Sequence, residues 1–402
     1  MRMGTVAVVG ASLAGLEAAR ALRAQGHDGR IVIVGAEAHM PYDRPPLSKG
    51  LLTGKEEVGD ITLSHPDDDA LDLDWRLGTA ATGLDPAGPT LTLSTGEQLR
   101  AGGVVIATGA VARQLPGLAA VSGEGDRGRP AGVHTLRTLE DALALRAEME
   151  RGPRLAVVGA GFIGSEVASA ARARGLEVTV VEALPVPLAG PLGPEMGRVC
   201  AGLHADHGTR LVCGVGVTGL VGTDRVEGLA LADGSVVPAD VVVVGVGAAP
   251  ALGWLAGSGL TLDGGVVCDQ SGDTGVPGVV VAGDAARAWS PWAGDHARYE
   301  HWTNAMEQPA RAVATLLGSP TTDPPRPPYF WSDQYGVRLQ LAGHRLTGDA
   351  VRVVEGDVEE RSFLAAYQRD GVTVAVLGCD RVRSFGRARR QLALPPGWDE
   401  GD

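Results

Sequence analysis

The chain has 402 residues, of which 44% are hydrophobic and 21% charged, so its length allows two or three globular domains with large cores. Its net charge of −13 argues against nucleic acid or an anionic membrane as a partner. The sequence shows no signal peptide, and no apolar run approaches the ~18 residues of a membrane-spanning helix. These features predict a cytoplasmic protein.

The N-terminal segment has the pattern of a dinucleotide-binding unit. An apolar strand from Val6 to Val9 leads into a glycine turn at Gly10, a helical pattern follows, and a second strand ends near an acid, Glu37. In such a unit the first glycine makes the turn, the second admits the pyrophosphate, and the third lets helix and strand pack closely. Ser12 stands at the second of these positions and Gly15 at the third. The helix N-terminus then faces the phosphates, and the acid accepts hydrogen bonds from a ribose.

A second copy of this pattern follows in the middle of the chain. The strand from Leu155 to Val158 leads into Gly159, Gly161 and Gly164, and the next strand ends at Glu182. Two complete units in one chain are much stronger evidence than one isolated glycine motif. The sequence therefore predicts two dinucleotide sites.

The second unit favours NADH over NADPH. Glu182 would repel a 2′-phosphate, and Ala183 follows it, with no arginine or lysine before Arg198.

The remaining segments divide the chain into three predicted domains. A sheet-like stretch covers Leu91 to Leu99, and the strand from Val104 to Ala107 leads the chain out of the first domain. The strand from Val241 to Val244 closes the second domain, and the segments Asp263–Cys268 and Val279–Asp284 are expected to complete the first. The expected division is a first domain from residues 1–113 and 248–320, a second from 114–247, and a third from 321–402.

The C-terminal region follows a proline-rich linker from Pro320 to Pro328. Strands are expected over Gln334–Ala342, Arg352–Glu355, Phe363–Gln368 and Val372–Leu377, before an arginine-rich helical tail. The pattern predicts a small α+β domain.

Several longer motifs resemble the ferredoxin reductase branch of the pyridine-nucleotide–disulfide oxidoreductase superfamily, which includes the putidaredoxin and rhodocoxin reductases. The resemblance covers essentially the whole chain, and it lies in the segments Pro41–Lys49, Ala107–Gly109, Thr274–Asp284, Glu300–Asn304 and Pro328–Tyr335. It implies an α/β fold like that of glutathione reductase, with two Rossmann-like domains and a smaller C-terminal domain. It also implies that FAD occupies the first site and NADH the second.

The resemblance assigns roles to particular residues. Lys49, Glu166 and Trp302 are expected at the catalytic end of the site, with Lys49 beside the flavin and Glu166 near the nicotinamide. Trp302 follows His301 at the start of a helix near the pyrimidine end of the flavin, and Asp284 is expected at the ribityl chain. The residues expected to bind FAD are Gly10, Ser12, Gly15, Glu37, Arg44, Lys49, Thr108, Gly109, Gly283, Asp284, His301 and Trp302. Those expected to bind NADH are Gly159, Gly161, Gly164, Glu182 and Gly245.

The cysteines restrict the electron acceptor. Disulfide reductases of this superfamily carry a redox cysteine pair after the FAD acid, and related oxidases and peroxidases carry one cysteine there. Here Pro41–Lys49 contains none, so the flavin is expected to pass electrons directly to an external acceptor. The resemblance implies an iron–sulfur ferredoxin that feeds an oxygenase, such as a cytochrome monooxygenase. The alternative is a flavin NADH dehydrogenase or oxidase that uses oxygen, quinone or another small acceptor.

An acidic ferredoxin would need a local basic surface on this acidic chain. The densest basic cluster is Arg381, Arg383, Arg387, Arg389 and Arg390, which predicts a docking patch, although a solvated helix face or a subunit contact remains an equal alternative. His204 and His207 have a spacing that a metal site could use, but no further ligand types lie nearby, so no metal is expected.

Overall fold

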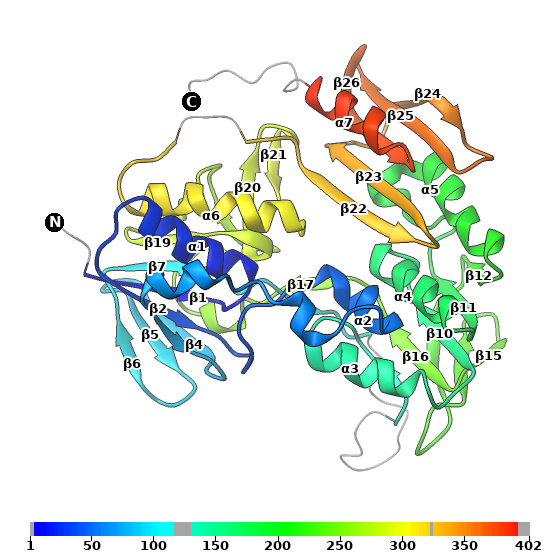
Figure 1. The fold of residues 1–402 in the computed structure, drawn as a ribbon, viewed down its shortest axis with the longest axis horizontal. Coiled ribbons are helices and arrows are strands. Elements are labelled where there is room, and N and C mark those ends of the chain that lie inside the picture. Colours follow the sequence, from blue (N-terminus) through cyan, green and yellow to red (C-terminus); the bar gives the residue numbers. More distant parts are fainter. Residues whose placement is uncertain (1–3, 116–129, 322–324, 393–402) are drawn as a thin grey trace.

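The computed structural model describes residues 4–115, 130–321 and 325–392, and Figure 1 shows two α/β units with a further sheet beside the second. The helices are α1 (Leu13–Ala24), α2 (Gly50–Thr53), α3 (Leu139–Glu148), α4 (Phe162–Ala173), α5 (Ala189–Asp206), α6 (Trp302–Leu316) and α7 (Val382–Arg390). Short 3₁₀ turns are η1 (Pro45–Ser48), η2 (Val58–Ile61), η3 (Pro66–Leu71), η4 (Gly253–Leu255) and η5 (Gly283–Ala285).

The first unit is built on a parallel five-stranded sheet in the order β19-β7-β1-β2-β3. Its strands are β1 (Thr5–Val9), β2 (Arg30–Val34), β3 (Leu73–Arg76), β7 (Gly103–Ile106) and β19 (Val279–Val281). The central strands are rich in valine and isoleucine because both faces of the sheet are covered. Helices α1 and α6 pack on the face of Val6 and Val8. An antiparallel sheet of β4 (Ala81–Asp85), β5 (Thr90–Leu93) and β6 (Gln98–Arg100) packs on the face of Ala7 and Val9.

The second unit repeats this arrangement. Its parallel sheet has the order β12-β11-β10-β16-β9. The strands are β9 (Val133–His134), β10 (Arg154–Val158), β11 (Glu177–Glu182), β12 (Arg210–Cys213) and β16 (Val241–Val244). Helices α3 and α4 cover one face, and the antiparallel strands β13 (Val217–Val221), β14 (Gly228–Leu231) and β15 (Val236–Pro238) cover the other. The sequence repeat is therefore a repeat of one three-layer architecture.

Two small sheets lie outside the two parallel sheets. Where the chain passes between the units, β8 (Ala110–Ala112) pairs antiparallel with β17 (Ala248–Pro250). Strands β18 (Val266–Cys268), β20 (Ala286–Ser290) and β21 (Asp295–Ala297) form a three-stranded sheet. Of the two segments expected to complete the first domain, β19 enters the five-stranded sheet, whereas β18 pairs with β20 instead.

The C-terminal region is an antiparallel sheet in the order β22-β23-β26-β25-β24. Its strands are β22 (Tyr329–Gln334), β23 (Val337–Gly343), β24 (Ala350–Asp357), β25 (Ser362–Arg369) and β26 (Val372–Cys379). One face packs on α5 of the second unit through Leu192, Met196 and Cys200, and the other face packs on Phe385 of α7.

The single strand expected over Gln334–Ala342 is wrong, because β22 ends at Gln334 and β23 begins at Val337. Tyr335 and Gly336 both have positive φ, 53° and 83°, as a two-residue hairpin turn requires. A tyrosine gives no sequence signal for such a turn, so the hairpin was missed.

The α/β class, with two Rossmann-like units and a smaller C-terminal α+β region, is confirmed. The domain boundaries at residues 113, 247 and 320 stay predictions, and part of the predicted proline-rich linker, residues 322–324, lies outside the described residues. Within the described part of the chain, no helix combines the length and the apolar character needed to cross a membrane.

The close packing of helix on strand at the second glycine turn gives a test of the fold. A Cβ added at Gly164 would lie 2.1 Å from the carbonyl oxygen of Gly159, whereas one added at Gly161 would meet nothing within 4 Å. We expect Gly164→Ala to destabilise the protein by about 2 kcal/mol, as overpacking does. Gly161→Ala should stay within about 0.5 kcal/mol of the wild type. Calorimetric melting of the two variants measures the difference, and equal melting temperatures would contradict the packing described.

Candidate functional site

The first glycine turn leaves a bare backbone surface at the carboxyl end of β1. Gly10 has a φ of 123°, and a Cβ there would lie 2.1 Å from the carbonyl oxygen of Ala107, directly before Thr108 and Gly109. A Cβ on Gly15 would lie 1.8 Å from the carbonyl oxygen of Gly10. The structure therefore brings Gly10, Gly15 and the end of β7 together, as the sequence predicted for a site built from backbone.

Ser12 stands at the N-cap of α1, and its side chain makes no capping bond to the helix. The first N–H groups of a helix have no intrahelical partner and carry the positive end of the helix dipole. Among the described residues the hydroxyl accepts one long hydrogen bond, 3.4 Å from Nε of Arg44. This end of α1 is thus arranged to accept an anion such as a pyrophosphate.

Glu37 and Arg44 lie together beside this helix end. Arg44 Nη2 donates to Glu37 Oε1 at 2.6 Å, and Tyr42 donates its hydroxyl to Glu37 Oε2 at 2.5 Å. Arg44 also stacks over the Tyr42 ring, 5.1 Å from its centroid. Arg44, expected in the segment against the flavin and its phosphates, therefore lies with Ser12 and Glu37 beside this helix end. Tyr42 was not predicted, although it lies within the recognised segment Pro41–Lys49.

Asp284 follows β19 and forms an ion pair with Arg137, whose Nη2 lies 2.7 Å from Oδ2 of Asp284. Arg137 Nε also donates to the carbonyl oxygen of Ala110. The neighbouring Gly283 N–H donates to Oε1 of Gln308 on α6. Arg137 belongs to no motif, and only the folded chain reveals it at this site.

Helix α6 begins at the predicted pair His301 and Trp302, with His301 as its N-cap. The Trp302 indole N–H donates to Oδ1 of Asp43 at 2.7 Å. Burial raises the pKa of Asp43 above its ordinary value, although the indole and Lys49 act in the opposite direction. Burial lowers the pKa of His301 to about 4, so this ring is neutral at pH 7.

The second glycine turn has the same construction as the first. Gly159 has a φ of 100°, and a Cβ there would lie 2.4 Å from the carbonyl oxygen of Gly245. Gly161 caps α4 and is open on its Cβ side. Glu182, at the end of β11, accepts from the backbone N–H groups of Ala160 at 2.9 Å and Leu184 at 2.8 Å. These bonds fix the carboxylate beside the turn, where it can receive ribose hydroxyls.

The two units meet at an ion pair between Lys49 and Glu166. Lys49 Nζ lies 2.8 Å from Glu166 Oε2, and the carboxylate side chain is 5% exposed. Ser48 donates its hydroxyl to the same oxygen at 2.5 Å, and Ser332 of β22 donates to Oε1 at 2.6 Å. The sequence predicted Lys49 and Glu166, but neither serine.

The residues present fit the predicted dinucleotides. Both glycine turns leave helix N-termini free for phosphates, and Gly161 leaves open space where a side chain would stand. The buried Nδ1 of His301 has no hydrogen-bond partner among the described residues, as expected for an atom that faces a bound cofactor. Ser12, Glu37, Arg44, Asp284 and His301 would hold FAD, and Gly161 and Glu182 would hold NADH.

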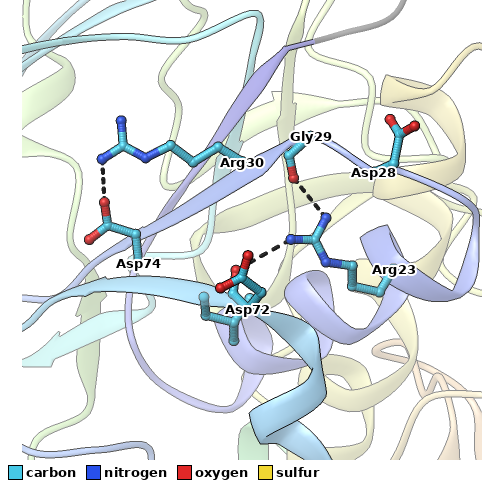
Figure 2. Close-up of a pocket in the computed structure, with 7 residues that line it drawn as sticks. Arg23, Asp28, Gly29, Arg30, Asp72 and Asp74 are labelled. Atoms are coloured by element: carbon cyan, nitrogen blue, oxygen red, sulfur yellow. Dashed lines mark hydrogen bonds and ion pairs between the residues drawn. The ribbon is translucent and has the colours of Figure 1, made fainter.

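Figure 2 shows a hollow of ≈ 370 Å³ elsewhere, lined by Arg23, Asp28, Gly29, Arg30, Asp72, Leu73 and Asp74. It lies where β2 and β3 begin, whereas nucleotides bind at the carboxyl ends of parallel strands. Arg23 donates to the carbonyl oxygens of Gly29 and Asp72, and Arg30 pairs with Asp74. Both guanidinium groups already bond to other groups of the protein, so this hollow is not part of the candidate site.

His204 and His207 both pack against Tyr335. His204 Nδ1 lies 2.8 Å from the hydroxyl of Tyr335, which stacks on the His207 ring with centroids 4.7 Å apart. Burial lowers the pKa of His204 to about 4. Among the described residues no cluster of three or more histidine, cysteine or acidic side chains could hold a metal.

Comparison with known proteins places this geometry in a family. Residues 4–309 match the family model of the pyridine nucleotide-disulphide oxidoreductases, and residues 329–395 match that of the reductase C-terminal domain. The chain is 36% identical over 385 residues to the ferredoxin reductase component of chlorobenzene dioxygenase from Cupriavidus sp., which covers 96% of this chain and 91% of the relative. It is 36% identical over 393 residues to rhodocoxin reductase from Rhodococcus erythropolis, covering 97% of this chain and 89% of the relative.

The fold is similar to that of the reductase in a crystal structure of the covalent putidaredoxin reductase–putidaredoxin complex. The TM-score is 0.90 at 31% identity, and the match covers 96% of this chain and 92% of that chain. The chain therefore belongs to the pyridine nucleotide-disulphide oxidoreductase family.

Proposed function

We propose that this chain is an NADH-dependent ferredoxin reductase that supplies electrons to an oxygenase. The observation that carries the proposal is the segment Pro45–Lys49, which presents Ser48 and Lys49 to Glu166 and contains no cysteine. Bound FAD supplies the chemistry, because it accepts two electrons as hydride from NADH and can donate them one at a time. An acceptor outside the chain is then required.

The four cysteines cannot replace the missing relay. Cys200 and Cys379 lie in the core between α5 and the C-terminal sheet, and Cys268 is buried in the first unit. Burial raises the pKa of Cys379 to about 12, and it also raises the pKa of Cys200 and Cys268. Cys213, at the end of β12, is half-buried, and its pKa is raised as well. Thiols of this kind are poor nucleophiles at neutral pH.

The side chains around the site position the predicted cofactor sites and stabilise charge there, and they do not react covalently. The ion pair of Lys49 with Glu166 joins the two nucleotide units, so it fixes the predicted flavin and nicotinamide sites relative to each other. The N-terminus of α6 stabilises negative charge placed against it. Asp43 holds the Trp302 ring through its indole N–H. NADH is favoured over NADPH because the Glu182 carboxylate, held at the end of β11 by two backbone N–H groups, would repel a 2′-phosphate.

The ferredoxin partner is proposed to dock on α7, and the structure divides the predicted arginines into two groups. Arg383, Arg387 and Arg390 are exposed, and their spacing of four and three places them along one face of the helix. Arg389 instead lies over the Tyr329 ring, 4.2 Å from its centroid, and Arg381 lies near Glu355. The three exposed arginines form the basic stripe that would attract an acidic partner.

Aromatic contacts connect this helix with the predicted flavin site. Tyr329, under Arg389, stacks on Trp331, and Trp331 meets Trp302 edge-on with centroids 5.8 Å apart. A ferredoxin on α7 would therefore stand over packed side chains that lead to the start of α6. The crystallised complex of putidaredoxin reductase with putidaredoxin supports an iron–sulfur partner of this kind.

Cytochrome c reduction by NADH tests the proposed function. We expect the rate of the FAD-loaded enzyme to depend strongly on an added ferredoxin, because the four cysteines of the chain are free thiols that form no redox pair to pass electrons on. Fast oxidation of NADH that is unchanged by several different ferredoxins would contradict the proposal and favour an oxidase or quinone reductase.

Charge reversal on α7 tests the docking surface separately. We expect the double variant Arg383→Glu, Arg387→Glu to lower kcat/KM for an acidic ferredoxin about tenfold or more at low salt, because like charges would then oppose the encounter. Turnover with ferricyanide should be unchanged, since that small acceptor needs no docking surface. Arg352→Glu, at an exposed arginine on the edge strand β24, is the control. Equal ferredoxin turnover in the α7 variant and the control would remove α7 from the interface.

A further inference from the structure

The Glu166 carboxylate accepts hydrogen bonds from Ser48 and Ser332 and forms an ion pair with Lys49, and these side chains come from two distant parts of the chain. Ser48 and Lys49 reach Oε2 from the end of η1, whereas Ser332 reaches Oε1 from β22 of the C-terminal sheet. Ser332 is fully buried, and Glu166 is 5% exposed, so water does not compete for these bonds. The C-terminal sheet thus supplies one of the groups that hold the carboxylate.

Gln334 determines the direction in which Ser332 donates. The Gln334 side-chain amide donates to the Ser332 hydroxyl oxygen at 3.0 Å, and Gln334 is 1% exposed. A serine hydroxyl has one proton to donate and two lone pairs that can accept. Here one lone pair accepts from the Gln334 amide, and the proton remains for another acceptor. The Ser332 proton is therefore directed toward Glu166 Oε1, 2.6 Å away.

Strand β22 is itself fixed along α4. Phe330 packs against Phe162 with ring centroids 4.3 Å apart, and the Tyr335 N–H donates to the Ser169 hydroxyl at 2.7 Å. Phe162, Glu166 and Ser169 are spaced by four and three residues, so they lie on one face of the helix. Ser332 meets that face between the two flanking contacts, which leaves its hydroxyl little freedom to move.

We propose that Ser332, oriented by Gln334, is a positioning residue that fixes the Glu166 carboxylate and, through it, the Lys49 ammonium group. With Oε1 held by Ser332, the plane of the carboxylate is set, and Oε2 stays where both Ser48 and Lys49 reach it. The C-terminal sheet then completes the site at which NADH reduces the flavin. This inference rests only on the NADH-to-flavin half of the proposed function, and it does not depend on the identity of the electron acceptor.

The test compares Ser332→Ala with Tyr335→Phe in the FAD-loaded protein. Both variants remove one hydroxyl from the contacts between the second unit and the C-terminal region. The Tyr335 hydroxyl bonds to His204 and Thr209, however, and not to Glu166. Anaerobic stopped-flow reduction by NADH gives the limiting rate and the apparent Kd, and crystal structures of both variants give the position of the Glu166 side chain.

We expect Ser332→Ala to lower the limiting rate of flavin reduction about tenfold, as the loss of one hydrogen bond to a charged group allows, with an apparent Kd for NADH within about twofold. The crystal structure should show the carboxylate rotated and the contact from Lys49 lengthened from 2.8 Å. Tyr335→Phe should keep the wild-type rate and carboxylate position. If Ser332→Ala does not fold, Gln334→Met, which removes the orienting amide, gives the same test with a smaller expected loss.

Three results would overturn the inference. They are a limiting rate for Ser332→Ala within twofold of the wild type, a reduced rate with the Glu166 carboxylate in its original place, and equal losses in Ser332→Ala and Tyr335→Phe. A lack of ferredoxin turnover in the unaltered enzyme would instead count against the proposed function, since flavin reduction is measured without any acceptor.

Discussion

The buried carboxylate of Glu166 is the point on which the arrangement of the site depends. Burying a charge is costly unless it is paired and hydrogen-bonded, and this one is satisfied only when three segments meet. Lys49 supplies the opposite charge, while Ser48 and Ser332 supply hydroxyl donors. Because the donors come from both ends of the chain, the carboxylate links the packing of the two nucleotide units to that of the C-terminal sheet.

The two nucleotide units share one architecture, but of their two helix acids only that of the second unit pairs with distant segments among the described residues. In both units a valine-rich strand ends in a glycine turn whose helix N-terminus is free for a phosphate. The units differ in what surrounds the helix. Glu17 stands two residues after Gly15, as Glu166 stands two residues after Gly164, yet Glu17 pairs locally with Arg20 of its own helix. The second helix, α4, is covered by η1 and β22, so its acid Glu166 lies between the first unit and the C-terminal sheet.

Local features of this site could be predicted from the sequence, whereas contacts between distant segments could not. The glycine turns, the acids that follow and the α/β class were predictable, because they follow from local backbone geometry and from strand and helix periodicity. The resemblance supplied Lys49, Glu166, His301 and Trp302. Arg137 and Ser332 were not found, because their roles arise from contacts between residues that are distant in sequence. The Tyr335–Gly336 turn was missed for another reason, since a tyrosine with positive φ violates the local preference.

We infer that electrons leave the flavin for an external acceptor without passing through a thiol of this chain. Anaerobic titration of the FAD-loaded protein with NADH tests it most directly, by counting the NADH consumed before reduction is complete. We expect one NADH per flavin, because the four cysteines are free thiols, none of which lies in the segment that faces Glu166. Consumption of two NADH per flavin would reveal a second two-electron centre, such as a redox disulfide, and would contradict direct transfer from the flavin.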